Sequence, residues 1–312
     1  MIVTVTTNPC VHKLIVYRSS ARVEKVVKPV VSSYQAGGKG LNVARAAARL
    51  GAKVLAVSTH GGTTGALFEE AVTADGFPAR LVRVAAPTRL STGLFDEDTG
   101  EFSEYLESGG AVTADEAETL FDVALAATAG ASIVALCGSS PHARLDDLFV
   151  RLLERTAGRV PVVVDTYGPP ARAVARSAPM LFKSNRDELV TSFGIERSEA
   201  ALVRFARERL EHGTRYVLIT GGADGALLFE PERILRFQGP RLVEKNPVGS
   251  GDAMFGGMLA ALEAGAAMAA ACQLGAAAGA ANAARLGVCD FERAEVERLA
   301  AQVHSREVPW PR

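Results

Sequence analysis

Residues 247–257 read P-V-G-S-G-D-A-M-F-G-G, a tight turn with two glycines that runs directly into a helical pattern. The N–H groups in the first turn of a helix have no carbonyl partner within that helix. Together with the helix dipole they favour an anion at this point, yet Asp252 places a negative charge there. A carboxylate beside an anion pocket is useful when it removes a proton from a nucleophile that attacks a phosphate.

The same four residues, 249–252, are also typical of an ordinary helix start. Serine and aspartate both cap unpaired N–H groups at helix N-termini. No G-x-x-x-x-G-K-[ST] loop occurs in the chain, and the stretch lacks the third glycine of a dinucleotide-binding fingerprint. Taken alone, the tetrapeptide favours a cap, so the choice depends on the rest of the chain.

Composition narrows the class of protein. The 312 residues are 48% hydrophobic and 22% charged, as in a soluble globular protein of one large or two smaller domains. A formal net charge of -1 gives no long-range field for nucleic acid or an anionic membrane. Residues 2–6 have a strand pattern rather than a basic leader and apolar core, so we expect a cytoplasmic protein.

Residues 264–284 carry no charge and are long enough to span a bilayer. They are mostly Ala and Gly, with Gln273 and Asn282 inside, which predicts a helix buried against a sheet. The histidines show no metal-ligand spacing. Four cysteines without a C-x-x-C pair are expected to be buried free thiols: Cys10, Cys137, Cys272 and Cys289.

Short β-branched runs alternate with longer helical patterns, which predicts a mostly parallel sheet with helices on both faces. The clearest expected strands are 3–7, 53–58, 133–137, 160–165, 180–183 and 216–220. Expected helices include 42–50, 64–75, 114–128, 143–157, 198–212 and 252–264. Polar residues follow several strands, and ligands bind at the carboxyl ends of parallel strands, so one cleft is expected.

Two segments, 13–35 and 87–108, have strand-like alternation without a helix between the strands. We expect them to form a small β-layer on a single α/β domain of residues 1–312. Such a layer is either a lid over the cleft or an oligomerisation surface.

A second glycine-rich turn lies at residues 36–45, A-G-G-K-G-L-N-V-A-R. Gly37, Gly38 and Gly40 allow close backbone approach, and a helix follows with Asn42 in its first turn. A flexible turn before a helix is the alternative. Two such turns, far apart in one α/β chain, favour a site with two polar ligands.

Here a family resemblance becomes specific. Residues 37–44 resemble the N-terminal signature of the phosphofructokinase B family, within the ribokinase-like sugar kinases, and residues 248–254 resemble its C-terminal G-A-G-D signature, with Ser250 in place of Ala. Further matches follow in family order: T-R at 88–89, G-S-S-P at 138–141, D-T-Y-G at 165–168, K-S-N-R-D-E-L at 183–189 and T-G-G-A-D-G at 220–225. Residues 6–9, 165–168 and 97–110 are most similar to the fructose-1-phosphate and tagatose-6-phosphate kinase branch.

The resemblance implies a ribokinase-like fold with a β-sheet lid and phosphoryl transfer from ATP to a sugar hydroxyl. Asp252 would be the general base, and the N–H groups of Gly249, Ser250 and Gly251 would form an anion hole. The sugar would be bound by His12, Gly38, Lys39, Asn42, Arg89, Ser139 and Asp252. The nucleotide would be bound by Lys183, Asn185, Thr220, Gly222, Gly225, Gly251 and Asn282.

Asn185 and Glu188 would hold Mg²⁺ through water, since Mg²⁺ keeps much of its hydration shell. A monovalent cation and a homodimer through the lid are left open by the resemblance. Each residue also has an ordinary interpretation: Asn185 as a turn former, Glu188 as a helix-start carboxylate, Arg89 as a solvated side chain and Ser139 as a cap of helix 143–157. Their family order favours the catalytic interpretation of Asp252.

Two departures concern the sugar side. His12 stands where the family has an Asp that binds sugar hydroxyls, and neutral imidazole offers one acceptor and one donor instead of two acceptors. Imidazolium could instead attract an acidic group. Residues 88–93 read T-R-L-S-T-G where the branch has T-R-x-N-V-K, so Gly93 replaces a lysine that Lys25 or Lys28 could substitute. Two hypotheses remain: a sugar or sugar-phosphate kinase with shifted acceptor specificity, or a ligand-binding protein of the same fold with little turnover.

Overall fold

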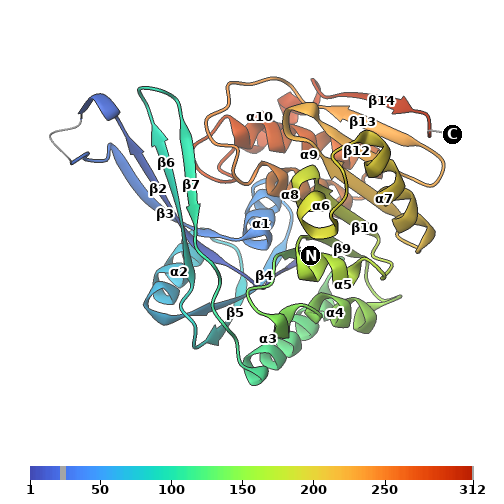
Figure 1. The fold of residues 1–312 in the computed structure, drawn as a ribbon, viewed down its shortest axis with the longest axis horizontal. Coiled ribbons are helices and arrows are strands. Elements are labelled where there is room, and N and C mark those ends of the chain that lie inside the picture. Colours follow the sequence, from blue (N-terminus) through green and yellow to red (C-terminus); the bar gives the residue numbers. More distant parts are fainter. Residues whose placement is uncertain (22–25, 311–312) are drawn as a thin grey trace.

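A ten-stranded sheet runs through the centre of the computed structural model, which describes residues 1–21 and 26–310 (Figure 1). Its strands are β1 (Ile2–Thr6), β4 (Val54–Gly61), β5 (Ala79–Val84), β8 (Ile133–Gly138), β9 (Val162–Thr166), β10 (Leu181–Asn185), β11 (Tyr216–Thr220), β12 (Ala226–Phe229), β13 (Ile234–Gln238) and β14 (His304–Val308). Their order is β14-β13-β12-β11-β10-β9-β8-β1-β4-β5. Neighbours from β11 to β5 are parallel, and β12, β13 and β14 extend one edge antiparallel.

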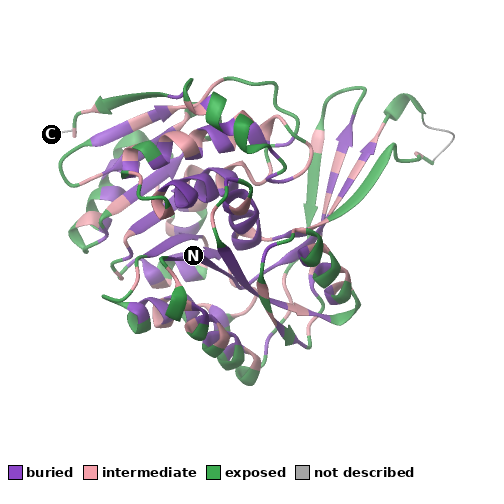
Figure 2. Cartoon of the chain, turned by 180° about the vertical axis from the view of Figure 1, so that it is seen from behind, coloured by how far each residue is buried: buried purple, intermediate pink, exposed green. Residues whose placement is uncertain are grey.

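Helices cover both faces of this sheet, as the strand–helix alternation predicts. They are α1 (Lys39–Arg49), α2 (Gly62–Ala74), α3 (Ala114–Ala127), α4 (Leu148–Thr156), α5 (Pro169–Val174), α6 (Arg186–Phe193), α7 (Glu199–Glu211), α8 (Ser250–Glu263), α9 (Met268–Ala283) and α10 (Arg293–Ala300). Alternate strand residues point to opposite faces, so Ile2 joins one core with α1, α2, α8, α9 and α10, whereas Val3 and Val5 join a second core with α3 to α7. Figure 2 shows the buried strands and helix faces of both layers.

Helices α1, α8 and α9 approach one another closely because glycines lie at their contacts. A Cβ added at Gly256 of α8 would lie 2.6 Å from the Cβ of Ala46 in α1. One added at Gly275 of α9 would lie 2.5 Å from Met254 O. The uncharged run 264–284 therefore forms a helix packed on α8, as expected, and among the described residues no helix is long and apolar enough to cross a membrane.

A four-stranded sheet forms the lid, a name we use for β2 (Cys10–Tyr17), β3 (Val31–Gly37), β6 (Arg89–Asp96) and β7 (Phe102–Leu106). It extends from one side of the body (Figure 1), in the order β3-β2-β6-β7. Both expected segments contribute, although β2 begins at Cys10, before the expected boundary. Leu14, Val16 and Phe95 form a small apolar cluster against Leu286 of the body. Lys25 lies outside the described residues.

Two expected helix boundaries differ from the structure. Helix 143–157 is divided into a 3-10 turn at Ala143–Leu145 and α4, with Asp147 at the N-cap of α4, a position that aspartate favours over a helix interior. Helix α1 begins at Lys39, before the expected residue 42, because Gly38 adopts a φ of 112° and serves as its N-cap. Strands β5, β12, β13 and β14 were not expected from the sequence pattern.

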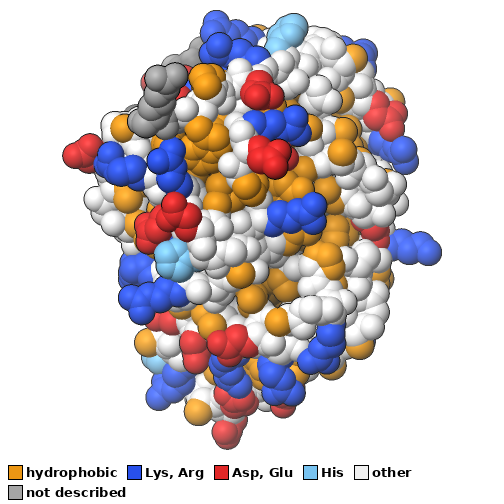
Figure 3. Space-filling view, turned by 90° about the vertical axis from the view of Figure 1, so that its right-hand side faces the viewer, with side chains coloured by type: hydrophobic (Ala, Val, Ile, Leu, Met, Phe, Trp, Pro, Cys, Tyr) orange, Lys and Arg blue, Asp and Glu red, His pale blue; other side chains and the backbone are white. Residues whose placement is uncertain are grey.

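Charged side chains of both signs are interspersed on the face of the body opposite the lid (Figure 3). This distribution agrees with the formal net charge of -1.

We predict that Gly256→Ala destabilises the protein even though alanine favours helix by about 1 kcal/mol. The new methyl group would overlap Ala46 and the Val43 carbonyl, and such overpacking costs about 1–3 kcal/mol. Urea unfolding measures the difference. Gly130→Ala is the matched control, because its Cβ would meet no heavy atom within 4 Å among the described residues. Equal stability of the two variants would contradict the proposed close contact.

Candidate active site

Asp252 lies buried in the first turn of α8, with 7% of its surface exposed. Its Oδ2 accepts a hydrogen bond of 2.7 Å from Asn42 Nδ2, which belongs to α1. The preceding Gly249 has a φ of 76°, and a Cβ there would lie 2.3 Å from Val288 Cγ1. Only glycine satisfies both the conformation and the close contact, so the turn fixes where Asp252 enters the site.

Burial raises the pKa of Asp252 above its ordinary value, because desolvation disfavours the carboxylate. Lys39, Lys183 and the hydrogen bond from Asn42 act in the opposite direction. They lower the pKa of Asp252 and so favour its carboxylate form. A raised pKa brings a carboxyl group closer to the pH at which a general base works best.

The anion turn, residues 249–251, is held from behind by Asn282 of α9. Asn282 Nδ2 donates to Val248 O and to Ser250 Oγ, both at 2.9 Å, and its Oδ1 accepts from the Cys289 amide at 2.6 Å. With 1% of its surface exposed, Asn282 supports the turn from within the protein. Asn282 was expected to border the nucleotide. In the structure both its amide nitrogen and its amide oxygen bond to other groups of the protein.

The donors of the anion turn differ from one another. The Ser250 amide donates to Pro247 O at 3.2 Å, so it is already engaged. The first-turn amides of Gly251 and Asp252 precede the point at which helical acceptors begin. A Cβ added at Gly251 would lie 3.1 Å from Lys183 Nζ. The positive end of α8 and a lysine ammonium group therefore lie side by side.

Asp165, at the end of β9, lies between two lysines. Its Oδ1 accepts from Lys39 Nζ at 2.8 Å and its Oδ2 from Lys183 Nζ at 2.6 Å. Burial raises the pKa of Asp165, but the two ammonium groups outweigh burial and hold the pKa below its ordinary value. Burial likewise lowers the pKa of Lys39, and Asp165, Glu188 and Asp252 outweigh it, so that the pKa lies well above the usual range. Asp165 and Lys39 are therefore both charged.

Lys39 was expected to face the sugar, and the structure directs its ammonium group to Asp165 and Glu188. Asp165 was not among the expected site residues, although the D-T-Y-G motif at 165–168 contains it. A carboxylate at the end of a central parallel strand was the sequence signal for it.

Asn185 and Glu188 form a capping box at the start of α6. The Glu188 amide donates to Asn185 Oδ1 at 2.8 Å, and the Asn185 amide donates to Glu188 Oε2 at 3.0 Å. The ordinary interpretation of both residues thus holds, and the other Glu188 oxygen still reaches Lys39. Within residues 1–21 and 26–310, no group of three or more His, Cys, Asp or Glu side chains could hold a metal ion directly. The donor set fits Mg²⁺ bound through water and phosphate oxygens.

Thr220 ends β11 and pairs with Asn185 of β10, so the two expected nucleotide contacts are neighbours. The turn that follows depends on glycine: Gly222 and Gly225 have φ values of 57° and 80°. A Cβ at Gly225 would lie 2.1 Å from Phe237 O. Thr220, Gly222 and Gly225 therefore lie at or just after the carboxyl end of β11, beside Asn185 at the end of β10.

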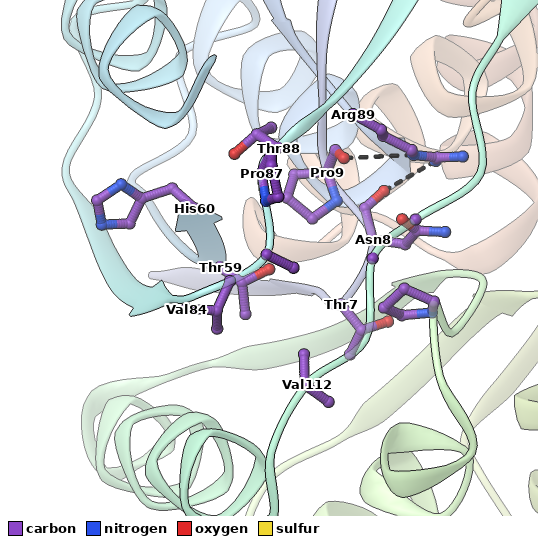
Figure 4. A pocket seen from close by; sticks show the side chains of 14 residues that line it. Thr7, Asn8, Pro9, Thr59, His60, Val84, Pro87, Thr88, Arg89 and Val112 are labelled. Carbon is purple, nitrogen blue, oxygen red and sulfur yellow. Dashed lines mark hydrogen bonds between the residues drawn. The ribbon is translucent and has the colours of Figure 1, made fainter. Parts of the chain in front are cut away.

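Arg89 and Ser139 are linked through Asn8, which follows the end of β1. Arg89 Nη2 donates to Asn8 O at 2.9 Å, and Asn8 Nδ2 donates to Ser139 Oγ at 3.1 Å. Arg89 also donates to Pro9 O and Glu107 O, so backbone carbonyls hold its guanidinium. Arg89, Asn8 and Pro9 line a pocket between the lid and the carboxyl ends of β1 and β4 (Figure 4).

His12 lies on the lid with 4% of its surface exposed, and its hydrogen bonds fix its tautomer. Ser91 Oγ donates its single hydrogen to Glu104 Oε1 at 2.5 Å, because a carboxylate can only accept. Ser91 Oγ must then accept from His12 Nδ1 at 3.0 Å, which makes Nδ1 the protonated nitrogen. His12 Nε2 is left as an acceptor without a partner among the described residues. Burial lowers the pKa of His12, although Glu104 opposes it, so the ring is neutral.

Gly93 cannot be exchanged for a long side chain without rearrangement. A Cβ there would lie 2.9 Å from Phe102 Cζ and 3.4 Å from His12 Cε1. Phe102 therefore occupies the space next to this position. Lys28, one of the two expected substitutes for a lysine here, is exposed on the lid.

We predict that Asp165→Asn destabilises the protein by about 3–5 kcal/mol, because it leaves two buried ammonium groups without their shared counter-charge. The folded pKa of Asp165 is depressed, so its stabilising contribution is present above the range in which unfolded aspartate titrates and is lost as pH falls through the folded pKa. Denaturant unfolding at neutral and acidic pH measures both effects. Glu118→Gln, which breaks the exposed pair with Arg151, is the control and should change stability little. A small effect of Asp165→Asn at neutral pH would contradict the prediction.

Comparison with known proteins supplies the family. The sequence matches the pfkB family carbohydrate kinases over residues 5–294. The 1-phosphofructokinase of Haloferax volcanii is 35% identical over 267 residues, which cover 85% of this chain and 85% of that protein. The 1-phosphofructokinase of Borreliella burgdorferi is 26% identical over 310 residues, 99% of each chain.

A solved structure gives the same result. Phosphofructokinase-2 from Escherichia coli in complex with potassium is 25% identical, has a TM-score of 0.86, and is matched over 98% of its length by 96% of this chain. Similarity in both sequence and structure extends from the central strand β1 into α10, and the chain belongs to the pfkB family of carbohydrate kinases.

Proposed function

We propose that this carbohydrate kinase transfers the terminal phosphoryl group of ATP to a hydroxyl group of a sugar phosphate, with Asp252 as general base. The observation that carries the proposal is the buried Asp252 carboxylate at the N-terminus of α8, where the helix dipole and Lys183 favour phosphate charge. The two curated relatives carry the name 1-phosphofructokinase, which supports a phosphorylated ketohexose as the acceptor.

In the proposed reaction Asp252 accepts the proton of the acceptor hydroxyl, and the acceptor oxygen forms a bond to the γ-phosphorus. The bond from that phosphorus to the bridging oxygen breaks, and ADP leaves with the electron pair. The amides of Gly251 and Asp252 and the Lys183 ammonium group would stabilise charge on the transferred phosphoryl group.

Asn185 and Glu188 would orient Mg²⁺ through water, and Thr220, Gly222 and Gly225 would border the nucleotide. Bound Mg²⁺ neutralises phosphate charge during the transfer. The E. coli relative solved with potassium supports a monovalent cation as a further cofactor here, a prediction that activity with and without KCl tests.

The acceptor site would combine Arg89, Ser139 and Gly38 with His12. Neutral His12 offers Nε2 as a single acceptor, so it would receive one hydroxyl hydrogen bond and would disfavour a carboxylate or phosphate at that point. A non-catalytic binder is not favoured, because the family assignment and the buried carboxylate both support turnover.

A homodimer through the lid stays a prediction. Apolar side chains are exposed on the lid strands, with Tyr34 at 49%, Tyr105 at 66% and Leu106 at 50%. Exposed aromatic side chains are typical of protein interfaces.

We predict that Asp252→Asn lowers kcat by on the order of 10²–10⁴-fold, because the amide cannot accept the hydroxyl proton. Mg²⁺-dependent ADP release with ATP and a panel of sugars and sugar phosphates measures it. Wild-type activity should fall as pH drops through the raised pKa of Asp252, above the range of an ordinary aspartate. Asp290→Asn is the control, since Asp290 is an exposed carboxylate that pairs with Arg49. Turnover retained by Asp252→Asn would exclude it as the base.

We predict that replacing His12 by Asp increases kcat/KM for fructose 1-phosphate and tagatose 6-phosphate by about tenfold, since a carboxylate accepts two hydroxyl hydrogen bonds. Glu104 Oε1 lies 3.9 Å from His12 Nδ1, so His12→Asp is combined with Glu104→Gln to avoid a like-charge pair. Glu104→Gln alone is the control. An unchanged profile across the panel would mean that position 12 does not contact the sugar.

A further inference from the structure

Arg45 is a buried arginine of α1 to which the proposed reaction assigns no role. Only 3% of its surface is exposed. Its Nε and Nη2 donate to the two carboxylate oxygens of Asp75, each at 2.7 Å, and Nη2 also donates to Ala36 O. Its Nη1 donates to Asn42 Oδ1 at 3.1 Å. A single guanidinium group therefore connects Asp75, the glycine turn that follows Ala36, and the residue that contacts Asp252.

Asp75 holds Arg45 in a bidentate pair from the C-terminal end of α2. The negative end of a helix dipole disfavours a carboxylate at this position. A bidentate arginine–carboxylate pair fixes the guanidinium plane as well as its position. Nη1 is thereby held at one point, directed at Asn42.

The amide of Asn42 has two orientations, and only one is compatible with both neighbours. With Oδ1 toward Arg45, Nδ2 donates to Asp252 Oδ2 at 2.7 Å. The reversed amide would place N–H groups against the guanidinium and an oxygen against the carboxylate. Arg45 thus decides that Asn42 presents a donor to the base.

We propose that Arg45, held by Asp75, is a positioning residue that orients the Asn42 amide so that it donates a hydrogen bond to the Asp252 carboxylate. The inference rests on Asp252 as the base of the proposed reaction. It assigns the pair Arg45 and Asp75 to the catalytic machinery, although neither would touch substrate. Without Arg45 the Asn42 amide loses the partner that holds Oδ1, and its hydrogen bond to the carboxylate is held less firmly.

The second arginine pair of α1 provides the contrast. Arg49 bonds Asp290 at 2.8 Å, but both side chains are well exposed, at 39% and 57%. The charged and titratable groups that face Asp252 lie on several elements: Lys39 on α1, Asp165 on β9, Lys183 on β10, and the thiols of Cys10, Cys137 and Cys289. The variants whose titrations are compared must therefore leave these side chains unchanged.

The test is the pH titration of the Asp252 carboxyl carbon by NMR in the full-length protein labelled at the aspartate side chains, with its signal assigned from Asp252→Asn. In Arg45→Met we expect the titration midpoint to rise by about one pH unit, since a hydrogen bond to the carboxylate is lost. Asn42→Ala should raise it by a similar amount, and Arg49→Met should leave it unchanged.

The double variant Arg45→Met/Asn42→Ala separates orientation from charge. If Arg45 acts through Asn42, the double variant shows no further rise beyond Asn42→Ala. A full additional rise would mean that Arg45 acts by its own charge, and an unchanged midpoint in Arg45→Met would remove the role altogether. Either result overturns the proposal.

Should Arg45→Met fail to fold, Arg45→Lys and Asp75→Asn carry the test, because both keep hydrogen-bonding groups in place. They should shift the midpoint in the same direction by a smaller amount, and no shift in either would overturn the proposal. The NMR midpoint needs no substrate, so it is independent of the proposed reaction. Active Asp252→Asn would refute the base, whereas an unmoved midpoint would refute only the role of Arg45. With ATP and fructose 1-phosphate, the acid limb of kcat should move with the midpoint.

Discussion

The buried carboxylate of Asp165, shared by the ammonium groups of Lys39 and Lys183, is the interaction on which the site depends. It connects the start of α1, the end of β9 and the end of β10 at one point. Burying one of these charges alone would be strongly unfavourable, so each requires the others. The charged state of Lys39 and Asp165 follows from this arrangement, and Lys183 Nζ lies beside the N-terminus of α8. The proposed phosphate site and the Asp252 carboxylate can then occupy neighbouring positions.

Small residues make that arrangement geometrically accessible. Because Gly256 contacts Ala46 and the backbone of α1, the helices α1 and α8 lie close together and their N-terminal turns converge. Asn42 and Asp252 meet at 2.7 Å as a result. The alanine- and glycine-rich α9 then supports α8 from the other side, and its Asn282 holds the anion turn. The composition of the C-terminal third is therefore tied directly to the position of Asp252.

The layers of the fold and the strand ends could largely be predicted from the sequence, since the strand–helix alternation and two glycine turns fix them, whereas the site assignments stay predictions. The ribokinase-like fold is confirmed. What could not be predicted is which side chains bond to one another. Lys39, which was expected to face the sugar, bonds to Asp165, and Arg45, for which the sequence indicated no partner, bonds to Asn42. Such choices depend on distances between segments remote in sequence, where a difference of a few ångströms decides between an ion pair and a ligand contact. The antiparallel strands β12 and β13 were not predicted for another reason: no helix lies between their short runs of sequence.

The residues on the body and the residues on the lid are held in place by different interactions. On the body, fixed charges and helix ends set the chemistry, and altering one charge leaves its buried partners unpaired. On the lid, a neutral imidazole is held in one tautomer by Ser91 and Glu104, and Phe102 occupies the space beside Gly93. Among residues 1–21 and 26–310, no buried ion pair of the body includes His12, so a change at this position leaves the network around Asp165 intact. Under the proposed function, acceptor selection would vary independently of phosphoryl transfer, in a chain that follows the family pattern on the body and departs from it on the lid at His12 and Gly93.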